Sequence, residues 1–258
     1  MDPITLILIA LAVVFLVIVG IVLFRASRFA IQLPEDNPIP LDRVDGEEVA
    51  RHIGLAIQMK TISNADPDKV DPLPFEGLRN LLKVLYPQVE DNLTREVIND
   101  GALLYTWQGS RADLDPVMVM AHQDVVSADP AGWTHPPFEG VIVDGFIWGR
   151  GSWDDKGNLM SQLEAVEMLV ASGYQPERTV YLAYGADEEV SGLRGATEIA
   201  ALLKQRGVHP DFVIDEGLLI LDGILPGLAK PAALIGVAEK GYLSVELSVS
   251  ATPGHSSM

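Results

Sequence analysis

The sequence contains no cysteine. The chain therefore forms no disulfide, binds no zinc through thiolates and has no cysteine nucleophile. This absence gives no firm indication of the compartment in which the protein works. Any metal site in this chain has to use imidazole and oxygen ligands.

Basic residues are scarce. Lys and Arg total 18 against 36 Asp and Glu in a chain of 258 residues, which gives a formal net charge of -18. Such an acidic surface repels phosphate backbones, so we expect no nucleic-acid partner. Apolar residues make up 48% of the chain, enough for a sizeable core in one large or two smaller domains. Part of the acidity is then available for a cation site.

Charge is absent from Ile4–Phe24, a largely apolar run of 21 residues. At ~1.5 Å per residue, a helix of this length spans the ~30 Å hydrocarbon core of a bilayer. The run lacks the polar stripe of a core helix and exceeds the roughly 7–15 apolar residues of a signal peptide. We expect residues 1–30 to be an uncleaved single-pass membrane anchor, with a cleavable signal peptide as the alternative. Arg25 and Arg28 favour a cytoplasmic domain, but two residues leave the side of the membrane open.

Three prolines among polar residues mark residues 31–45 as a linker. Beyond it, the spacing of apolar residues predicts two helices, Gly46–Ile62 and Phe75–Leu85. Two alternating stretches, Thr94–Ile98 and Ala102–Trp107, then predict a hairpin with residues 99–101 as its turn.

The chain then alternates between short apolar strands and helices. Buried core strands are expected at Val117–Met120, Val180–Tyr184 and Phe212–Ile214, and helices at Lys156–Ser172 and Ser191–Arg206. Strands and helices in this order form a sheet with helices on both faces. We therefore predict a doubly wound α/β domain.

Ionisable residues follow each of these strands directly. Open α/β sheets place their ligand sites at the carboxyl ends of the strands. Each residue also has an ordinary alternative role, as a loop histidine, a solvated glutamate or an aspartate that caps a turn. Their common location instead favours a site for a divalent metal ion with room for substrate or water. The residues are His122 and Asp124 after the first strand, Asp187, Glu188 and Glu189 after the second, and Asp215 and Glu216 after the third.

Within this set, residue types and spacing indicate separate roles. The loop Gly149–Asn158 carries Asp154, which we interpret as a carboxylate shared between two metal ions, in a tight glycine-rich turn. Asp124 is well spaced to hold the second ring nitrogen of His122. In the adjacent pair Glu188 and Glu189, one carboxylate can bind metal while the other accepts a proton from water.

These motifs together resemble a known family. They are Met120–Val126, Trp133 with Pro136–Phe138, Gly149–Gly157, Asp187–Glu189 and Asp215–Gly217. In this order they resemble the M20 family of di-zinc peptidases and amidohydrolases, and most closely its Gly-X carboxypeptidase and N-acyl-amino-acid hydrolase branch. The resemblance extends from about residue 47 to the last residue.

The resemblance implies two Zn²⁺ ions, with Co²⁺ and Mn²⁺ as alternatives. By position, His122 and Asp215 would bind the first ion, Glu189 the second, and Asp154 would bridge them. The resemblance also makes Glu188 the general base and Asp124 the residue that orients His122. It further implies a cis peptide bond between Asp154 and Asp155.

The family pattern also divides the chain into domains. It implies a zinc-peptidase domain over residues 46–238 and the start of a lid or dimerisation domain over residues 239–258, entered by a strand within Glu239–Val249. His255 in that segment would stabilise the oxyanion, with an ordinary turn histidine as the alternative. A second histidine ligand expected further along has no match in this sequence. We therefore expect an incomplete metal site and little activity from these residues alone.

The predicted function is a metal-dependent hydrolase. It would cleave amide bonds in short peptides, as a carboxypeptidase does, or in N-acyl amino acids, by metal-activated water. Its partners would be these small substrates, the membrane and a second copy bound through the lid. Two alternatives remain, namely an enzyme of the same mechanism that acts on another small amide, and an anchored receptor-like protein without catalysis. A purely structural metal is disfavoured because such zinc sites are usually closed and rich in cysteine.

Overall fold

The computed structural model describes residues 2–28, 44–99, 101–224, 227, 230–238, 240–241, 243 and 245–250. The chain divides into two units, residues 1–44 and 45–258. The first unit contains helix α1, Pro3–Ser27, whose amino end is capped by the Asp2 side chain. This helix is long and apolar enough to cross a membrane, and none of its residues is buried. A signal sequence has the same properties.

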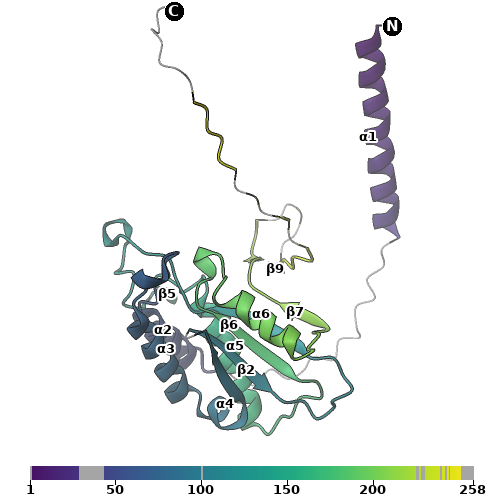
Figure 1. Ribbon diagram of the computed structural model, residues 1–258. Helices are drawn as coiled ribbons and strands as arrows, with labels where there is room; N and C mark the ends of the chain where they lie inside the picture. Colours follow the sequence, from purple (N-terminus) through teal and green to yellow (C-terminus); the bar gives the residue numbers. More distant parts are fainter. Residues whose placement is uncertain are drawn as a thin grey trace, which may run out of the picture. The chain divides into compact units, whose positions relative to one another are not determined.

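The second unit is built on a five-stranded sheet in the order β1-β2-β6-β3-β7. Strands β2, β6 and β7 of this sheet are labelled in Figure 1. The predicted hairpin is confirmed, because β1 pairs antiparallel with β2 and β2 antiparallel with β6. Strand β3 lies parallel to both β6 and β7. The strands are β1 Thr94–Ile98, β2 Ala102–Trp107, β3 Val117–His122, β6 Val180–Gly185 and β7 Phe212–Ile214.

Helices cover both faces of this sheet, as the α/β pattern predicts. Side chains alternate across strand β2, so Leu103 and Tyr105 point into one core while Leu104 points into the other. The larger core also receives residues of α2, Gly46–Gln58; α3, Pro72–Leu85; α4, Pro87–Asn92; and α5, Lys156–Ala171. The smaller core is closed by α6, Ala196–Gln205, on the opposite face (Figure 1).

Helix ends follow the local sequence. Asp45 caps α2 by accepting hydrogen bonds from the backbone N–H groups of Glu47 and Glu48. Gly173, with φ +79°, ends α5 at the expected place. The remaining elements are the hairpin of β4 Val141–Val143 and β5 Phe146–Trp148, the pair β8 Ile220–Leu221 and β9 Ala232–Ala233, and the short 3-10 helices Pro67–Lys69, Pro130–Gly132 and Glu188–Val190.

Three sequence-based expectations are wrong. Strand β7 is not a buried core strand, because Phe212, Val213 and Ile214 are 47–53% exposed at the edge of the sheet. Helix α6 begins at Ala196 rather than at Ser191, since Ser191 and Gly192 have positive φ values that a right-handed helix does not accept. The expected strand within residues 239–249 is absent from the described part of that segment. Its alternating apolar residues pair with no neighbouring strand among the described residues.

The packing of α2 against the hairpin loop depends on two glycines in backbone contact. A Cβ atom on Gly54 would lie 2.8 Å from the carbonyl oxygen of Gly140, and one on Gly140 only 2.2 Å from that of Gly54. Alanine normally stabilises a helix by ~1 kcal/mol relative to glycine. At position 54 the backbone of Gly140 leaves no room for that methyl group.

We expect Gly54→Ala to lower the free energy of unfolding by about 1–3 kcal/mol, the usual effect of overpacking. The matched control is Gly46→Ala at the start of the same helix, where an added Cβ meets nothing within 4 Å. Urea denaturation monitored by circular dichroism measures both. Equal stability of the two variants would contradict the close approach.

Candidate metal centre

The candidate centre lies where the parallel strands end. His122 is the last residue of β3, and Gly185 at the end of β6 is its partner in register. The 3-10 helix Glu188–Val190 follows β6, and Glu216 comes two residues after β7. Parallel pairing therefore brings a histidine and acids from three strands to one edge of the sheet.

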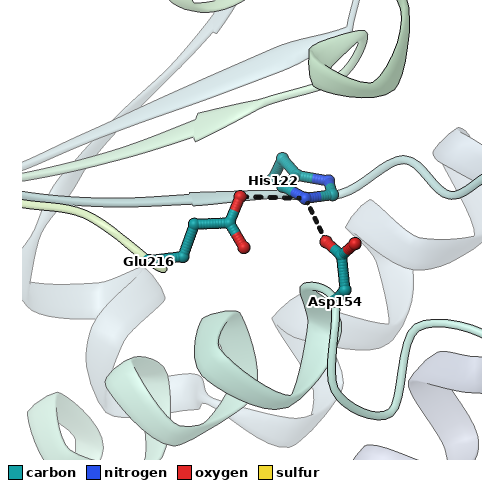
Figure 2. A group of neighbouring side chains, drawn as sticks. All are labelled: His122, Asp154 and Glu216. Carbon is teal, nitrogen blue, oxygen red and sulfur yellow. Dashed lines mark hydrogen bonds and ion pairs between the residues drawn. The ribbon is translucent and has the colours of Figure 1, made fainter. Parts of the chain in front are cut away.

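Three side chains at this edge form a group that fits a divalent cation (Figure 2). His122 Nε2 lies 2.8 Å from Asp154 Oδ1 and 3.4 Å from Glu216 Oε1. The ligand atoms of all three lie within 4.8 Å of one another. An imidazole with carboxylates is a donor set that zinc and similar ions accept. The residues present therefore fit the expected metal.

The ring of His122 is held so that Nε2 faces these acids. Its Nδ1 lies 3.0 Å from the backbone carbonyl oxygen of Asp124 and 3.4 Å from the Oδ1 atom of the same residue. The tautomer with a proton on Nδ1 donates to that carbonyl and leaves the lone pair of Nε2 free. Burial alone would lower the pKa of His122, but the carboxylates of Asp124, Asp155 and Glu216 outweigh it and raise the pKa to about 10.

Asp124 has a second role that the sequence analysis did not anticipate. Its fully buried carboxylate accepts hydrogen bonds from the backbone N–H groups of Glu188 at 3.1 Å and Glu189 at 3.2 Å. Burial would raise the pKa of Asp124, yet its hydrogen bonds and the nearby His122 keep it below the usual value. Asp124 thus contacts both the predicted ligand and the turn that carries the two glutamates. Spacing alone could not reveal the second contact.

The two glutamates differ in their positions around His122. The carboxylate of Glu188 reaches to 3.8 Å from His122 Nε2, and its side chain is 54% exposed. Glu189 is half-buried and lies outside the group of three. Burial is the largest cause that raises the pKa of both carboxyl groups, and the negative charge of Asp154 adds to it. A raised pKa favours proton transfer near neutral pH.

For the two acids after β7, the ligand predicted from the sequence is not the residue that the structure places nearest to His122. Sequence analysis assigns Asp215 as a ligand, but the carboxylate near His122 belongs to its neighbour Glu216. Asp215 lines the same cavity of about 270 Å³, together with His122 and Glu188. Its own carboxylate accepts the backbone N–H of Glu216. Both residues follow the strand directly, so the pattern of strand ends could not choose between them.

The loop that carries Asp154 has the cis peptide bond expected between Asp154 and Asp155. Asp155 is buried, and its carboxylate accepts the backbone N–H of His122 at 3.1 Å. Burial is the main cause that raises the pKa of Asp155 to about 7. A Cβ on Gly157 would lie 2.2 Å from the Ser152 carbonyl oxygen, so only glycine fits there.

The other histidines lie elsewhere. His255 is outside the described residues, so the structure does not place the predicted lid histidine. His52 is buried on α2 beside Glu164, and His135 stacks edge-on against Trp148. Neither they nor His209 join the metal-binding group found among the described residues.

Comparison with known proteins agrees with this geometry. The sequence model that describes peptidase family M20/M25/M40 matches residues 118–252 of this chain. An N-fatty-acyl-amino acid synthase/hydrolase of Danio rerio is 46% identical over 82% of this chain and 42% of its own length. A probable carboxypeptidase S-like protein of Dictyostelium discoideum is 38% identical over 93% of this chain and 49% of its own. The chain thus spans less than half the length of these relatives.

A solved structure confirms the fold. Human carnosine dipeptidase 1 superposes with a TM-score of 0.56 at 20% identity, covering 67% of this chain and 39% of the other. The sequence model of the family covers the strand ends that carry the predicted metal ligands. The relative from Danio rerio is 46% identical over 82% of this chain. The chain belongs to peptidase family M20/M25/M40.

Proposed function

We propose that this chain provides the metal-binding and proton-transfer residues of a metal-dependent hydrolase that cleaves amide bonds. The observation that carries the proposal is the convergence of His122, Asp154 and Glu188 at one edge of the sheet. Nucleophilic side chains are not needed for this chemistry, which suits a chain without cysteine.

We assign two Zn²⁺ ions to the site. Their ligands would be His122, Asp154, Glu189 and Asp215, with Glu216 as a further carboxylate within reach of His122. When bound, such ions polarise an amide carbonyl and lower the pKa of water. A cluster of acids that repel one another without a cation supports this assignment.

Glu188 is the proposed general base and acid. Its carboxylate would accept the proton of the attacking water and deliver it to the leaving nitrogen, so that one proton moves and none is lost. The raised pKa of Glu188 helps it to hold that proton between the two steps. Asp124 fixes the backbone of Glu188 and so limits the positions that the carboxylate can reach.

The substrates are proposed from the relatives. The relatives are named as an N-fatty-acyl-amino acid synthase/hydrolase and a probable carboxypeptidase S-like protein. An N-acyl amino acid and a peptide with a free carboxyl end share an amide bond next to a carboxylate. We propose this shared group as the substrate class, with His255 of a lid domain over residues 239–258 stabilising the oxyanion.

The remaining parts of the proposal concern assembly. Residues 46–238 would form the catalytic domain, joined by a linker over residues 31–45 to a membrane anchor in residues 1–30. The length and apolar composition of α1 support the anchor. A homodimer through the lid completes the proposal.

Glu188→Gln in the full-length protein should lower kcat for an N-acyl amino acid by about 10²–10⁴-fold, because glutamine cannot carry the proton. Metal content should stay unchanged. The exposed Glu198→Gln on α6 serves as the matched control and should retain wild-type turnover. Hydrolysis at the wild-type rate by Glu188→Gln would remove this residue from the mechanism.

Metal binding should weaken as the pH falls. In the metal-free protein the pKa values of His122, Glu188, Glu189 and Glu216 are all raised, so these groups keep their protons to higher pH than usual, and an incoming cation competes with those protons. Lower pH keeps more of them protonated and therefore opposes the cation. Calorimetric Zn²⁺ titrations at several pH values, in buffers of different ionisation enthalpy, would detect the released protons. Zinc affinity independent of pH would contradict this site.

A further inference from the structure

Lys156 is a buried lysine close in sequence to the proposed metal ligand Asp154. It is the first residue of α5, two positions after Asp154, and its side chain is completely buried. Its Nζ donates hydrogen bonds to the backbone carbonyl oxygens of Ala56 at 3.0 Å and Met59 at 2.5 Å. A lysine is seldom buried without a role for its polar end.

The two acceptors lie at the carboxyl end of α2. That helix ends at Gln58, and the last carbonyl groups of a helix have no partner within the helix. The carbonyl oxygen of Ala56 also accepts the backbone N–H of Met59 at 3.1 Å, and that of Met59 accepts the N–H of Thr61 at 2.8 Å. Lys156 adds a second hydrogen bond to each from another element of the fold. Burial lowers the pKa of Lys156 to about 7, against the attraction of Asp124. Both hydrogen bonds survive loss of the proton, because a neutral amine still has two N–H donors for two carbonyls.

The chain after α2 supports the segment that contains Asp124. The backbone N–H of Val125 donates to the Thr61 carbonyl at 2.9 Å, and the Thr61 hydroxyl donates to the Gln123 carbonyl at 2.6 Å. Asp124 lies between these two contacts, two residues after His122. The end of α2 therefore supports His122 and Asp124 from one side and, through Lys156, the Asp154 loop from the other.

The loop is also shaped around the lysine. Gly151 has φ +88°, and a Cβ atom there would lie 2.9 Å from Val125 Cγ1 and 3.3 Å from Lys156 Cδ. The aliphatic part of Lys156 thus passes close to Gly151, whose missing side chain leaves the space. Hydrogen bonds and packing both fix this side chain.

We propose that Lys156 is a positioning residue that sets the distance between His122 and Asp154 by anchoring the Asp154 loop to the end of α2. The proposal rests on the metal site proposed above. The hydrogen bonds of Lys156 go to the backbone carbonyls of Ala56 and Met59 and not to the ligand atoms. It acts through the backbone that carries them.

Lys156→Met in the full-length protein tests the proposal, because methionine fills a similar volume and donates no hydrogen bond. We expect a 10–100-fold rise in the Co²⁺ dissociation constant, the usual effect of losing an outer contact of a metal site. The visible absorption bands of bound Co²⁺ should change in position or intensity. For an N-acyl amino acid, kcat should fall more than KM rises.

Two further variants separate positioning from stability. Leu163→Ala removes a fully buried side chain of the same helix, so it should lower the melting temperature and leave the Co²⁺ spectrum unchanged. Thr61→Val removes the hydroxyl contact to Gln123 while keeping the shape, and should weaken Co²⁺ binding in the same direction as Lys156→Met. It keeps the test decisive if the methionine variant does not fold.

The outcomes are distinct. Wild-type spectrum and affinity in both Lys156→Met and Thr61→Val would overturn the positioning role and leave the metal site intact. An equal spectral change in Leu163→Ala would also overturn it, since general loosening would then explain the effect. A wild-type protein that binds no Co²⁺ would overturn the proposed function and this inference together.

Discussion

The parallel pairing of β3 with β6 and β7 is the constraint on which the rest of this structure depends. His122 lies opposite Gly185 at the end of β6, and Val119 lies opposite Ile214 at the end of β7. All three strands therefore stop within a few residues of one another at the same edge. The sheet therefore brings the polar residues that directly follow these strands to the carboxyl ends of the strands, without long loops. A shift of register would move His122 away from the glutamates that follow β6.

This convergence has an electrostatic cost. Acids from three strands gather around one imidazole, and burial and mutual repulsion raise the pKa values of Glu188, Glu189 and Glu216. Asp124 is the exception, because its hydrogen bonds keep its pKa low in spite of complete burial. The two behaviours indicate different roles. The carboxylate of Asp124, with two backbone donors, stays charged and holds the structure, whereas the three glutamates favour a cation or a proton.

Sequence periodicity predicts most of this fold because the core strands and helices are strongly patterned. The bounds of β1, β2 and β7 are those expected, and β3, β6 and α5 differ by one or two residues. The start of α6 was missed since Ser191 can enter a helix, and only the structure shows its positive φ. The exposure of β7 was missed because a short apolar run does not show what covers it. The proximity of Glu216 depends on the path of the chain after β7, which residue spacing does not determine.

Burial separates the residues of the centre into two groups. Asp124, Asp155 and Lys156 are almost completely buried, and each bonds to backbone groups of another segment. The carboxylates of Asp154 and Glu188 are about half exposed, and they extend from the backbone that the buried group fixes. Buried polar groups with full hydrogen bonding have one favourable arrangement, because any other leaves a donor or acceptor unpaired. The buried layer therefore supplies the rigidity, and the exposed carboxylates stay free to bind a cation or move a proton. The proposed metal and proton-transfer site needs both properties, and this fold assigns them to different residues of the same centre.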